Sequence, residues 1–154
     1  MVKILFVCYG NICRSPMAEF IMKDLCDKKG VGDKVYIESA ATSTEELGNP
    51  VHYGTRKVLD RLGIDYSGKY ARQITKADYK NFDYIIGMEK MNKRDMLWFF
   101  GDDKDSKISL LMDYTPFPHD VADPWYTHNF EVTYQDVKQG TDGLLDFLKK
   151  NKKI

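Results

Sequence analysis

Cys8 and Arg14 are separated by five residues near the start of the chain, in the stretch Cys8-Tyr9-Gly10-Asn11-Ile12-Cys13-Arg14-Ser15-Pro16. A loop this short can curl so that backbone N–H groups and the guanidinium of Arg14 surround the three oxygens of a phosphate. The planar guanidinium binds two of these oxygens at once, a geometry that a lysine does not reproduce. Cys8 would then attack phosphorus as a thiolate, which Arg14 and the N-terminus of a following helix both favour. These residues predict a phosphatase that forms a phosphocysteine.

The other residues of the loop have supporting roles in this interpretation. Ser15 can donate a hydrogen bond to the Cys8 sulfur, and Gly10 and Asn11 are the loop residues that best tolerate a positive φ. Cys13 either packs as a small apolar side chain or pairs with Cys8 under oxidation, which would shield the nucleophile from overoxidation. The predicted phosphate-binding loop consists of Tyr9, Gly10, Asn11, Ile12, Cys13 and Ser15.

The elements around the loop predict a parallel sheet. The apolar run before Cys8 is typical of a buried strand, and a helix is expected directly after the loop, with Ser15 as its N-cap and Pro16 at its first position. Strands and helices then alternate, which is typical of an α/β fold with helices on both faces of a parallel sheet. Further strands are expected at 35–37, 83–88 and 108–111, helices at 49–62, 89–100 and 130–148, and mostly loop at 64–80 and 113–128.

The composition narrows the class of protein. The 154 residues favour a single domain spanning 1–154, and 23 basic against 23 acidic residues give no bulk attraction to nucleic acid or to an anionic membrane. No apolar run has the length of a membrane span, and a cleaved leader would remove Cys8, so a cytoplasmic location is expected. The three cysteines (Cys8, Cys13 and Cys26) argue against a disulfide framework, and their spacing argues against a zinc site.

The chain closely resembles the low-molecular-weight protein tyrosine phosphatases over nearly its whole length. The resemblance rests on the cysteine–arginine loop followed by Ser-Pro, on the run 39–43 (Ser-Ala-Ala-Thr-Ser), and on Asp123-Pro124-Trp125-Tyr126. It implies a four-stranded parallel sheet with the phosphate-binding loop after the first strand, and neither metal nor cofactor. It also implies that Asn11 forms a hydrogen bond towards Ser39.

The resemblance assigns Asp123 as the general acid that protonates the leaving phenolate and then activates water. Asp113 and Asp120 are other carboxylates in the same predicted loop, and Asp123 is favoured because Pro124 matches the family motif. The predicted substrate cleft consists of Ile12, Glu45, Trp125 and Tyr126, in which the two aromatic residues would sandwich a phenyl ring.

The predicted activity is hydrolysis of phosphotyrosine in proteins, and of small aryl phosphates, with inorganic phosphate as product and the enzyme a monomer or weak dimer. Three other functions are alternatives to this activity. An arsenate reductase on this fold needs further cysteines downstream, and none follows Cys26. A protein-arginine phosphatase tends to have threonine where this chain has the apolar Ile12. A cysteine phosphocarrier, which passes phosphate to a partner domain, has less need of Arg14 and Asp123.

Two positions depart from the family pattern. The family often has a histidine just before the Ala-Arg-Gln found here at 71–73, where this chain has Lys69-Tyr70. An aromatic wall of the cleft is also replaced near Thr44, and Glu45 and Glu46 occupy this stretch. These two carboxylates suggest the hypothesis that substrates with basic neighbours are preferred.

Overall fold

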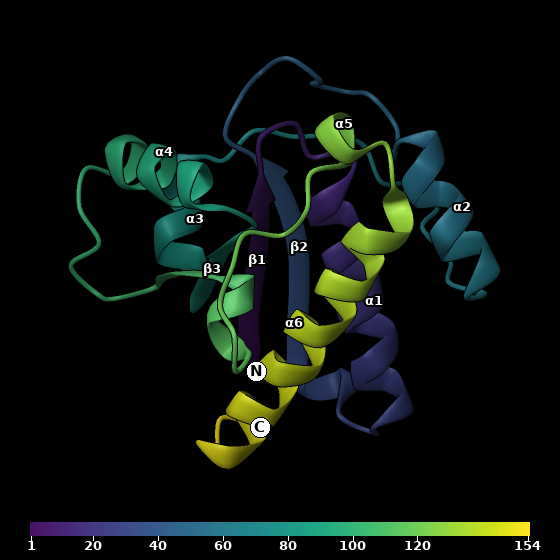
Figure 1. Cartoon of the computed structure of the whole chain (residues 1–154). Helices are drawn as coiled ribbons and strands as arrows, with labels where there is room; N and C mark the ends of the chain where they lie inside the picture. Colours follow the sequence, from purple (N-terminus) through teal and green to yellow (C-terminus); the bar gives the residue numbers. More distant parts are fainter.

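The computed structural model describes residues 1–154 and contains a four-stranded sheet in which all strands are parallel (Figure 1). The strands lie in the order β2-β1-β3-β4, so that the first strand of the chain is central. This confirms the predicted α/β fold. The strands are β1 (Val2–Cys8), β2 (Val35–Ala41), β3 (Tyr84–Gly87) and β4 (Ile108–Leu110).

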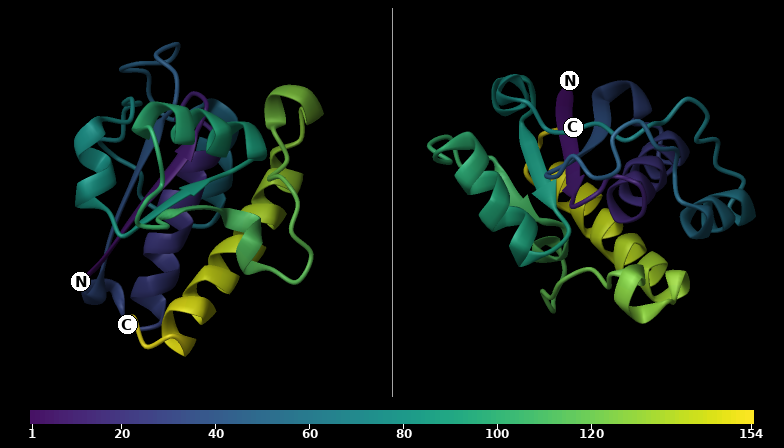
Figure 2. Two further views of the ribbon diagram at one scale, coloured as in Figure 1. Left: turned by 90° about the vertical axis from the view of Figure 1, so that its left-hand side faces the viewer. Right: turned by 90° about the horizontal axis from the view of Figure 1, so that it is seen from above.

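Helices cover both faces of the sheet, as Figure 2 shows most clearly in the view from above. One face is covered by α1 and α6 and the other by α3 and α4. None of the helices is long and apolar enough to cross a membrane. The α-helices are α1 (Arg14–Lys28), α2 (Tyr53–Arg61), α3 (Lys76–Asn81), α4 (Lys90–Phe100), α5 (Pro124–Thr127) and α6 (Phe130–Lys150), and two short 3₁₀ turns are η1 (Gly32–Lys34) and η2 (Leu111–Tyr114).

The apolar run of β1 is explained by burial on both sides. Ile4 and Phe6 pack into the cluster formed with α1 and α6, whereas Leu5 and Val7 point into the smaller cluster beneath α3 and α4. Because alternate side chains of a strand face opposite sides, a central strand covered on both faces has to be apolar throughout. The same burial fixes the position of Cys8 at the carboxyl end of β1.

Two helices begin at residues other than those predicted from the sequence. α1 begins at Arg14, and the residue at its N-cap position, Cys13, makes no side-chain capping bond. The predicted cap, Ser15, lies inside the helix because its hydroxyl group binds side chains of the loop instead. α2 begins at Tyr53 and not at residues 49–50, since the ring of His52 accepts a hydrogen bond from the backbone of Gly54 and so provides the cap.

The two regions expected to be mostly loop each contain a short helix. α3 lies within the first of them and begins with a capping box, in which Thr75 and Asp78 each satisfy a backbone N–H group of the other. α5 lies within the second and is capped by Asp123, whose side chain accepts from the backbone of Trp125. Both helices are only a turn or two long, so a pattern of apolar residues could not reveal them.

The glycines of α6 allow it to approach η2 closely. A Cβ atom at Gly143 would collide with the backbone carbonyl oxygen of Tyr114, and one at Gly140 would collide with the side chain of Leu111. The usual helix penalty for glycine is therefore offset here by packing, because a side chain at either position would push η2 away.

Replacing Gly143 by alanine should therefore destabilise the protein, although alanine is the better helix former. We expect the free energy of unfolding to fall by about 1–3 kcal/mol, since the obstructing atom belongs to the backbone and cannot rotate away. Urea denaturation followed by circular dichroism measures this. The control is Gln139→Ala, an exposed position of the same helix, which should change stability little. A stabilised Gly143→Ala variant would contradict the packing argument.

Candidate active site

The carboxyl ends of the central strands meet at one edge of the sheet, where the loop after β1 carries Cys8 into the site. The register places Cys8 beside Ala41 of β2 and Val7 beside Gly87 of β3. The loop after β2 is tied to the same place, because the backbone of Thr42 donates to the Cys8 carbonyl at 3.0 Å. Sites of open parallel sheets lie at this edge.

The loop curls around the Cys8 sulfur. Asn11 has a φ of 60° and its backbone N–H group donates to the sulfur at 3.3 Å. Gly10, for which a positive φ was also predicted, does not have one. Its lack of a side chain serves a different purpose, since a Cβ atom there would lie only 3.2 Å from Cγ of Glu46. Gly10 therefore allows the loop after β2 to lie close over the phosphate-binding loop.

A chain of hydrogen bonds leads from the sulfur of Cys8 into the protein. The side-chain amide of Asn11 donates to the hydroxyl groups of Ser15, at 2.8 Å, and Ser39, at 2.9 Å. Its oxygen accepts from the backbone of Arg72 at 3.1 Å, which fixes the orientation of the amide. The Ser15 oxygen, which accepts from Asn11, lies 3.0 Å from the Cys8 sulfur. A thiolate at Cys8 can only accept, and in that state the bond runs from the hydroxyl group of Ser15 to the sulfur; the other acceptor near this hydroxyl group is the carbonyl of Ala40, at 3.5 Å.

A buried carboxylate that the sequence analysis missed closes this chain. Ser39 donates its proton to Glu19 at 2.6 Å, so its oxygen is left to accept from Asn11. Glu19 is only 4 % exposed and is paired with the ammonium groups of Lys23, at 2.6 Å, and Lys69, at 3.6 Å. Its position four residues after Ser15, on the same face of α1, was a usable signal.

Lys69, one of the residues that depart from the family pattern, has a structural role in this protein. Its ammonium group also donates to the carbonyl of Ser39 at 2.8 Å, on the outer edge of β2. Burial lowers the pKa of Lys69, and the neighbouring Glu19 opposes this shift. From the outer edge of the sheet, Lys69 therefore stabilises the part of β2 that carries Ser39.

The guanidinium of Arg14 lies among acceptors from two other segments. It donates to Glu89 at 3.2 Å, to Asp123 at 3.3 Å and to the carbonyl of Val121 at 3.3 Å. Burial opposes its charge, but the Cys8 sulfur and the carboxylates of Glu89 and Asp123 outweigh burial, so the pKa of Arg14 is raised. Glu89 was not predicted, although its place directly after β3, at the functional edge, pointed to it.

Asp123 is the carboxylate of its loop that reaches Arg14. The two alternatives are occupied elsewhere: Asp113 accepts from the backbone of Leu110 at 2.9 Å and Asp120 from the backbone of Lys90 at 3.1 Å. One oxygen of Asp123 caps α5 and the other binds Arg14, so the side chain is held from both sides.

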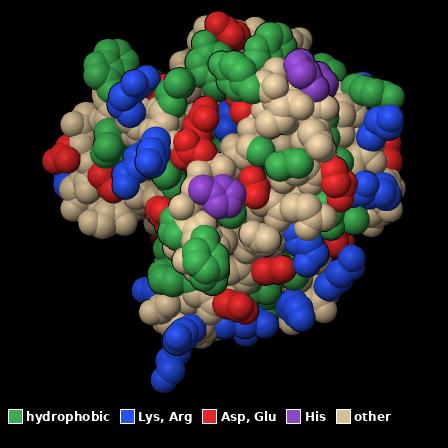
Figure 3. Space-filling view, in the orientation of Figure 1, with side chains coloured by type: hydrophobic (Ala, Val, Ile, Leu, Met, Phe, Trp, Pro, Cys, Tyr) green, Lys and Arg blue, Asp and Glu red, His purple; other side chains and the backbone are tan.

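Aromatic side chains stand at the rim of this site. Trp125 and Tyr126 are each 79 % exposed and lie on α5, where Figure 3 shows hydrophobic side chains gathered at the top of the molecule. Tyr9 is half-exposed, and the neighbouring carboxylate of Glu45 raises the pKa of its hydroxyl group. Ile12 is half-buried in the loop. These groups supply apolar surface beside the phosphate-binding loop, with an exposed carboxylate near one edge.

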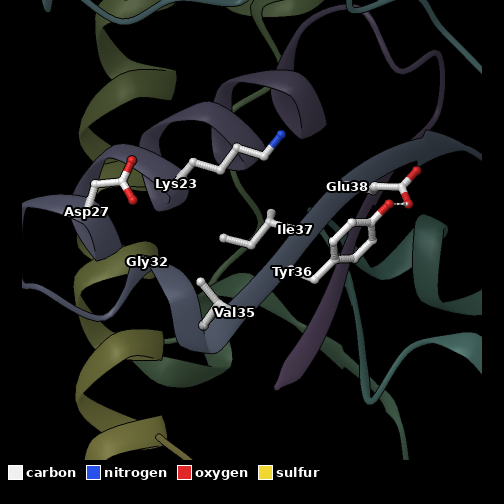
Figure 4. Close-up of a pocket in the computed structure, with 7 residues that line it drawn as sticks. All are labelled: Lys23, Asp27, Gly32, Val35, Tyr36, Ile37 and Glu38. Carbon is white, nitrogen blue, oxygen red and sulfur yellow. Dashed lines mark hydrogen bonds between the residues drawn. The ribbon is translucent and has the colours of Figure 1, made fainter.

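A separate hollow of about 450 Å³ lies along the outer edge of β2 (Figure 4). It is lined by residues of α1, η1 and β2, and Tyr36 donates to Glu38 across it. Lys23 of this hollow is also a partner of Glu19, but none of the residues around Cys8 faces it. The hollow is therefore distinct from the site at the loop.

Comparison with known proteins agrees with this geometry. Residues 3–154 match the family model described as "Low molecular weight phosphotyrosine protein phosphatase". The chain belongs to this family. It is 44 % identical to the low molecular weight protein-tyrosine-phosphatase YfkJ of Bacillus subtilis, over the whole of both chains. The family members are phosphatases, and this chain is an enzyme of that class.

Solved structures of the family have the same fold. The crystal structure of YfkJ matches with a TM-score of 0.95, covering 99 % of this chain and 97 % of that one. SP-PTP from Streptococcus pyogenes is 45 % identical, with a TM-score of 0.84 and coverage of 97 % and 93 %. DARP, described as a drosophila arginine phosphatase, is 29 % identical, with a TM-score of 0.88 and coverage of 96 % and 98 %. The fold of the phosphatase is thus shared with at least one relative named for a different phosphorylated residue.

Replacing Glu19 by glutamine should destabilise the protein strongly, because it leaves the largely buried ammonium group of Lys69 without a counter-charge. We expect a loss of about 3–5 kcal/mol, as for removal of one partner of a buried ion pair. Urea denaturation provides the measurement. The matched control is Asp24→Asn on the exposed side of α1, where the pair with Lys28 is worth less than about 1 kcal/mol. Equal effects of the two substitutions would contradict the importance of the buried pair.

Cys13 should be unreactive towards iodoacetamide at neutral pH. Burial disfavours its thiolate and, with the nearby Cys8, raises its pKa to about 12. In a Cys8→Ser variant, which removes the contribution of Cys8 but keeps the burial, alkylation of Cys13 should therefore stay slow from about pH 7 to pH 9. Peptide mass spectrometry separates Cys13 from Cys26. In urea, Cys13 should react readily near pH 9; equally rapid labelling of the folded protein at that pH would contradict the assignment.

Proposed function

We propose that this phosphatase hydrolyses phosphotyrosine in cytoplasmic proteins, and small aryl phosphates, through a phosphocysteine on Cys8. The observation that carries the proposal is the meeting of three groups: the Cys8 sulfur inside a curled loop, the buried guanidinium of Arg14 beside it, and the carboxylate of Asp123 bound to that guanidinium. A nucleophile, a phosphate-binding cation and an acid are the parts that this reaction needs.

In the first step the Cys8 thiolate attacks phosphorus and forms the S–P bond, while the bond from phosphorus to the phenol oxygen breaks. The carboxylic acid of Asp123 gives its proton to that oxygen, so a neutral phenol leaves. Arg14 binds two of the phosphate oxygens, and the amides of the loop bind the charge that the transition state spreads over them. Ser15 donates to the sulfur and so stabilises the thiolate.

In the second step Asp123, now a carboxylate, takes a proton from a water molecule as the water attacks the phosphocysteine. The S–P bond breaks, the thiolate is restored and inorganic phosphate leaves. The hydrogen bond from Ser15 makes the sulfur a better leaving group here than a free thiolate would be. One carboxylate thus serves as acid and then as base, which keeps the proton balance of the two steps closed.

The cleft favours phosphotyrosine over phosphoarginine. Ile12, Trp125 and Tyr126 present apolar and aromatic surface beside the loop, which suits a phenyl ring better than a guanidinium. Because DARP is described as an arginine phosphatase and has the same fold, phosphoarginine is the alternative substrate that has to be tested. Steady-state assays on phosphotyrosine, phosphoarginine and phosphoserine peptides, with and without a thiol reductant, separate these activities. Preference for the phosphoarginine peptide would overturn the proposed substrate.

The Cys8→Ser variant should lose turnover altogether, whereas the effect of Asp123→Ala should depend on the leaving group. General acid catalysis contributes roughly 100- to 10,000-fold, and a poor leaving group such as phenol needs it most. We therefore expect Asp123→Ala to lower kcat/KM, which reports only the steps up to release of the phenol, far more for phenyl phosphate than for 2,4-dinitrophenyl phosphate. A uniform loss across leaving groups would show that Asp123 is not the acid.

A further inference from the structure

Both backbone polar groups of Ala122, the residue before Asp123, are held by α6. The backbone N–H group of Ala122 donates to Asp136 at 2.9 Å, and the carbonyl of Ala122 accepts from the hydroxyl group of Thr133 at 2.8 Å. Thr133 is fully buried, and the side chain of Asp136 is 15 % exposed. The two residues are three positions apart and therefore lie on the same face of the helix. The segment before α5 runs beside this half of α6 (Figure 1).

The preceding residue is held from the opposite side. The N–H group of Val121 donates to the carbonyl of Met88 at the end of β3, and its carbonyl accepts from Arg14. Four backbone groups in two consecutive residues are thus bonded, one to the segment after β3, one to Arg14 of α1 and two to α6. The next residue along the chain is Asp123, whose carboxylate has to face the leaving oxygen.

We propose that Thr133 and Asp136 are positioning residues for the acid: by fixing the Ala122 peptide, they set the place and direction of the Asp123 carboxylate. This inference rests on the proposed role of Asp123. Neither residue belongs to the loop around Cys8 or to the aromatic rim, so they act through Asp123 and not on the substrate.

The size of the effect follows from the chemistry of proton transfer. An acid has to lie within hydrogen-bond distance of the atom that it protonates, and a displacement of about 1 Å can cost roughly 100-fold in rate. Loss of either bond also leaves a buried backbone group without a partner, which favours a shift of the segment. The imidazole of His119 is the other titratable group beside Asp136, with its ring nitrogen 3.7 Å from the second carboxylate oxygen, and it forms no hydrogen bond to Ala122.

The test compares Thr133→Val and Asp136→Ala with Asp136→Asn, which keeps an oxygen able to accept from Ala122. The surface control is Asp142→Ala on the same helix, which loses only the pair with Lys138. We expect the first two variants to lower kcat/KM for phenyl phosphate about tenfold, part of the contribution of a general acid, and to change kcat/KM for 2,4-dinitrophenyl phosphate less than about twofold. Asp136→Asn should retain most of the wild-type rate with both substrates, and Asp142→Ala should equal the wild type.

Two further measurements separate positioning from general loss of structure. In an Asp123→Ala background, Asp136→Ala should cause no additional loss of kcat/KM with phenyl phosphate, because its effect passes through the missing carboxylate. Amide hydrogen exchange of the peptide containing residues 121–123 should be faster in Thr133→Val and Asp136→Ala than in the wild type, at unchanged exchange in β1.

The outcomes are distinct. Equal losses of kcat/KM for both leaving groups, an additional loss in the Asp123→Ala background, or unchanged exchange at 121–123 would each overturn the positioning role. If Asp123→Ala itself shows no dependence on the leaving group, the proposed acid is wrong, and the positioning of an acid by Thr133 and Asp136 fails with it for that separate reason.

Discussion

The structure depends on the compensation of one buried charge, that of Arg14. A guanidinium that is only 3 % exposed is stable only if its donors find acceptors, because a buried unpaired charge is far more costly than any single contact. The acceptors come from the segment after β3, as Glu89, and from the segment before α5, as Val121 and Asp123. The charge that we propose binds phosphate therefore also holds together the segments that form the site.

The second requirement is that the polar groups near the sulfur bond to one another. Asn11 donates to both Ser39 and Ser15, and the carboxylate of Glu19 accepts the proton of Ser39. The hydroxyl proton of Ser15 has two acceptors within reach, the Cys8 sulfur at 3.0 Å and the carbonyl of Ala40 at 3.5 Å. The burial of Glu19 is offset by Lys23 and Lys69.

Besides covering one face of the sheet, α6 positions two other segments of the chain. Its glycines let η2 pack against it, and its first turns bond the peptide before Asp123. The last helix of the chain therefore locates a residue of the loop that precedes it, while the first strand locates Cys8. The site is assembled from opposite ends of the chain because parallel strands with crossover helices bring these segments to one edge.

The sequence by itself determined the α/β alternation, a buried first strand, and the loop with Cys8 and Arg14, because these follow from local patterns of apolar residues and from spacing within one short segment. Only the tertiary structure decided that the first strand is central, that α1 begins at Arg14, and that Gly10 lies against the side chain of Glu46 without a positive φ. The same holds for the places of Glu19, Glu89, Thr133 and Asp136 around the site. The hydroxyl of Ser15 illustrates the reason: it is a good helix cap locally, but a sulfur and an amide brought beside it by folding bind it instead. Which partner a polar side chain takes depends on groups distant in sequence, and a single sequence does not contain their distances.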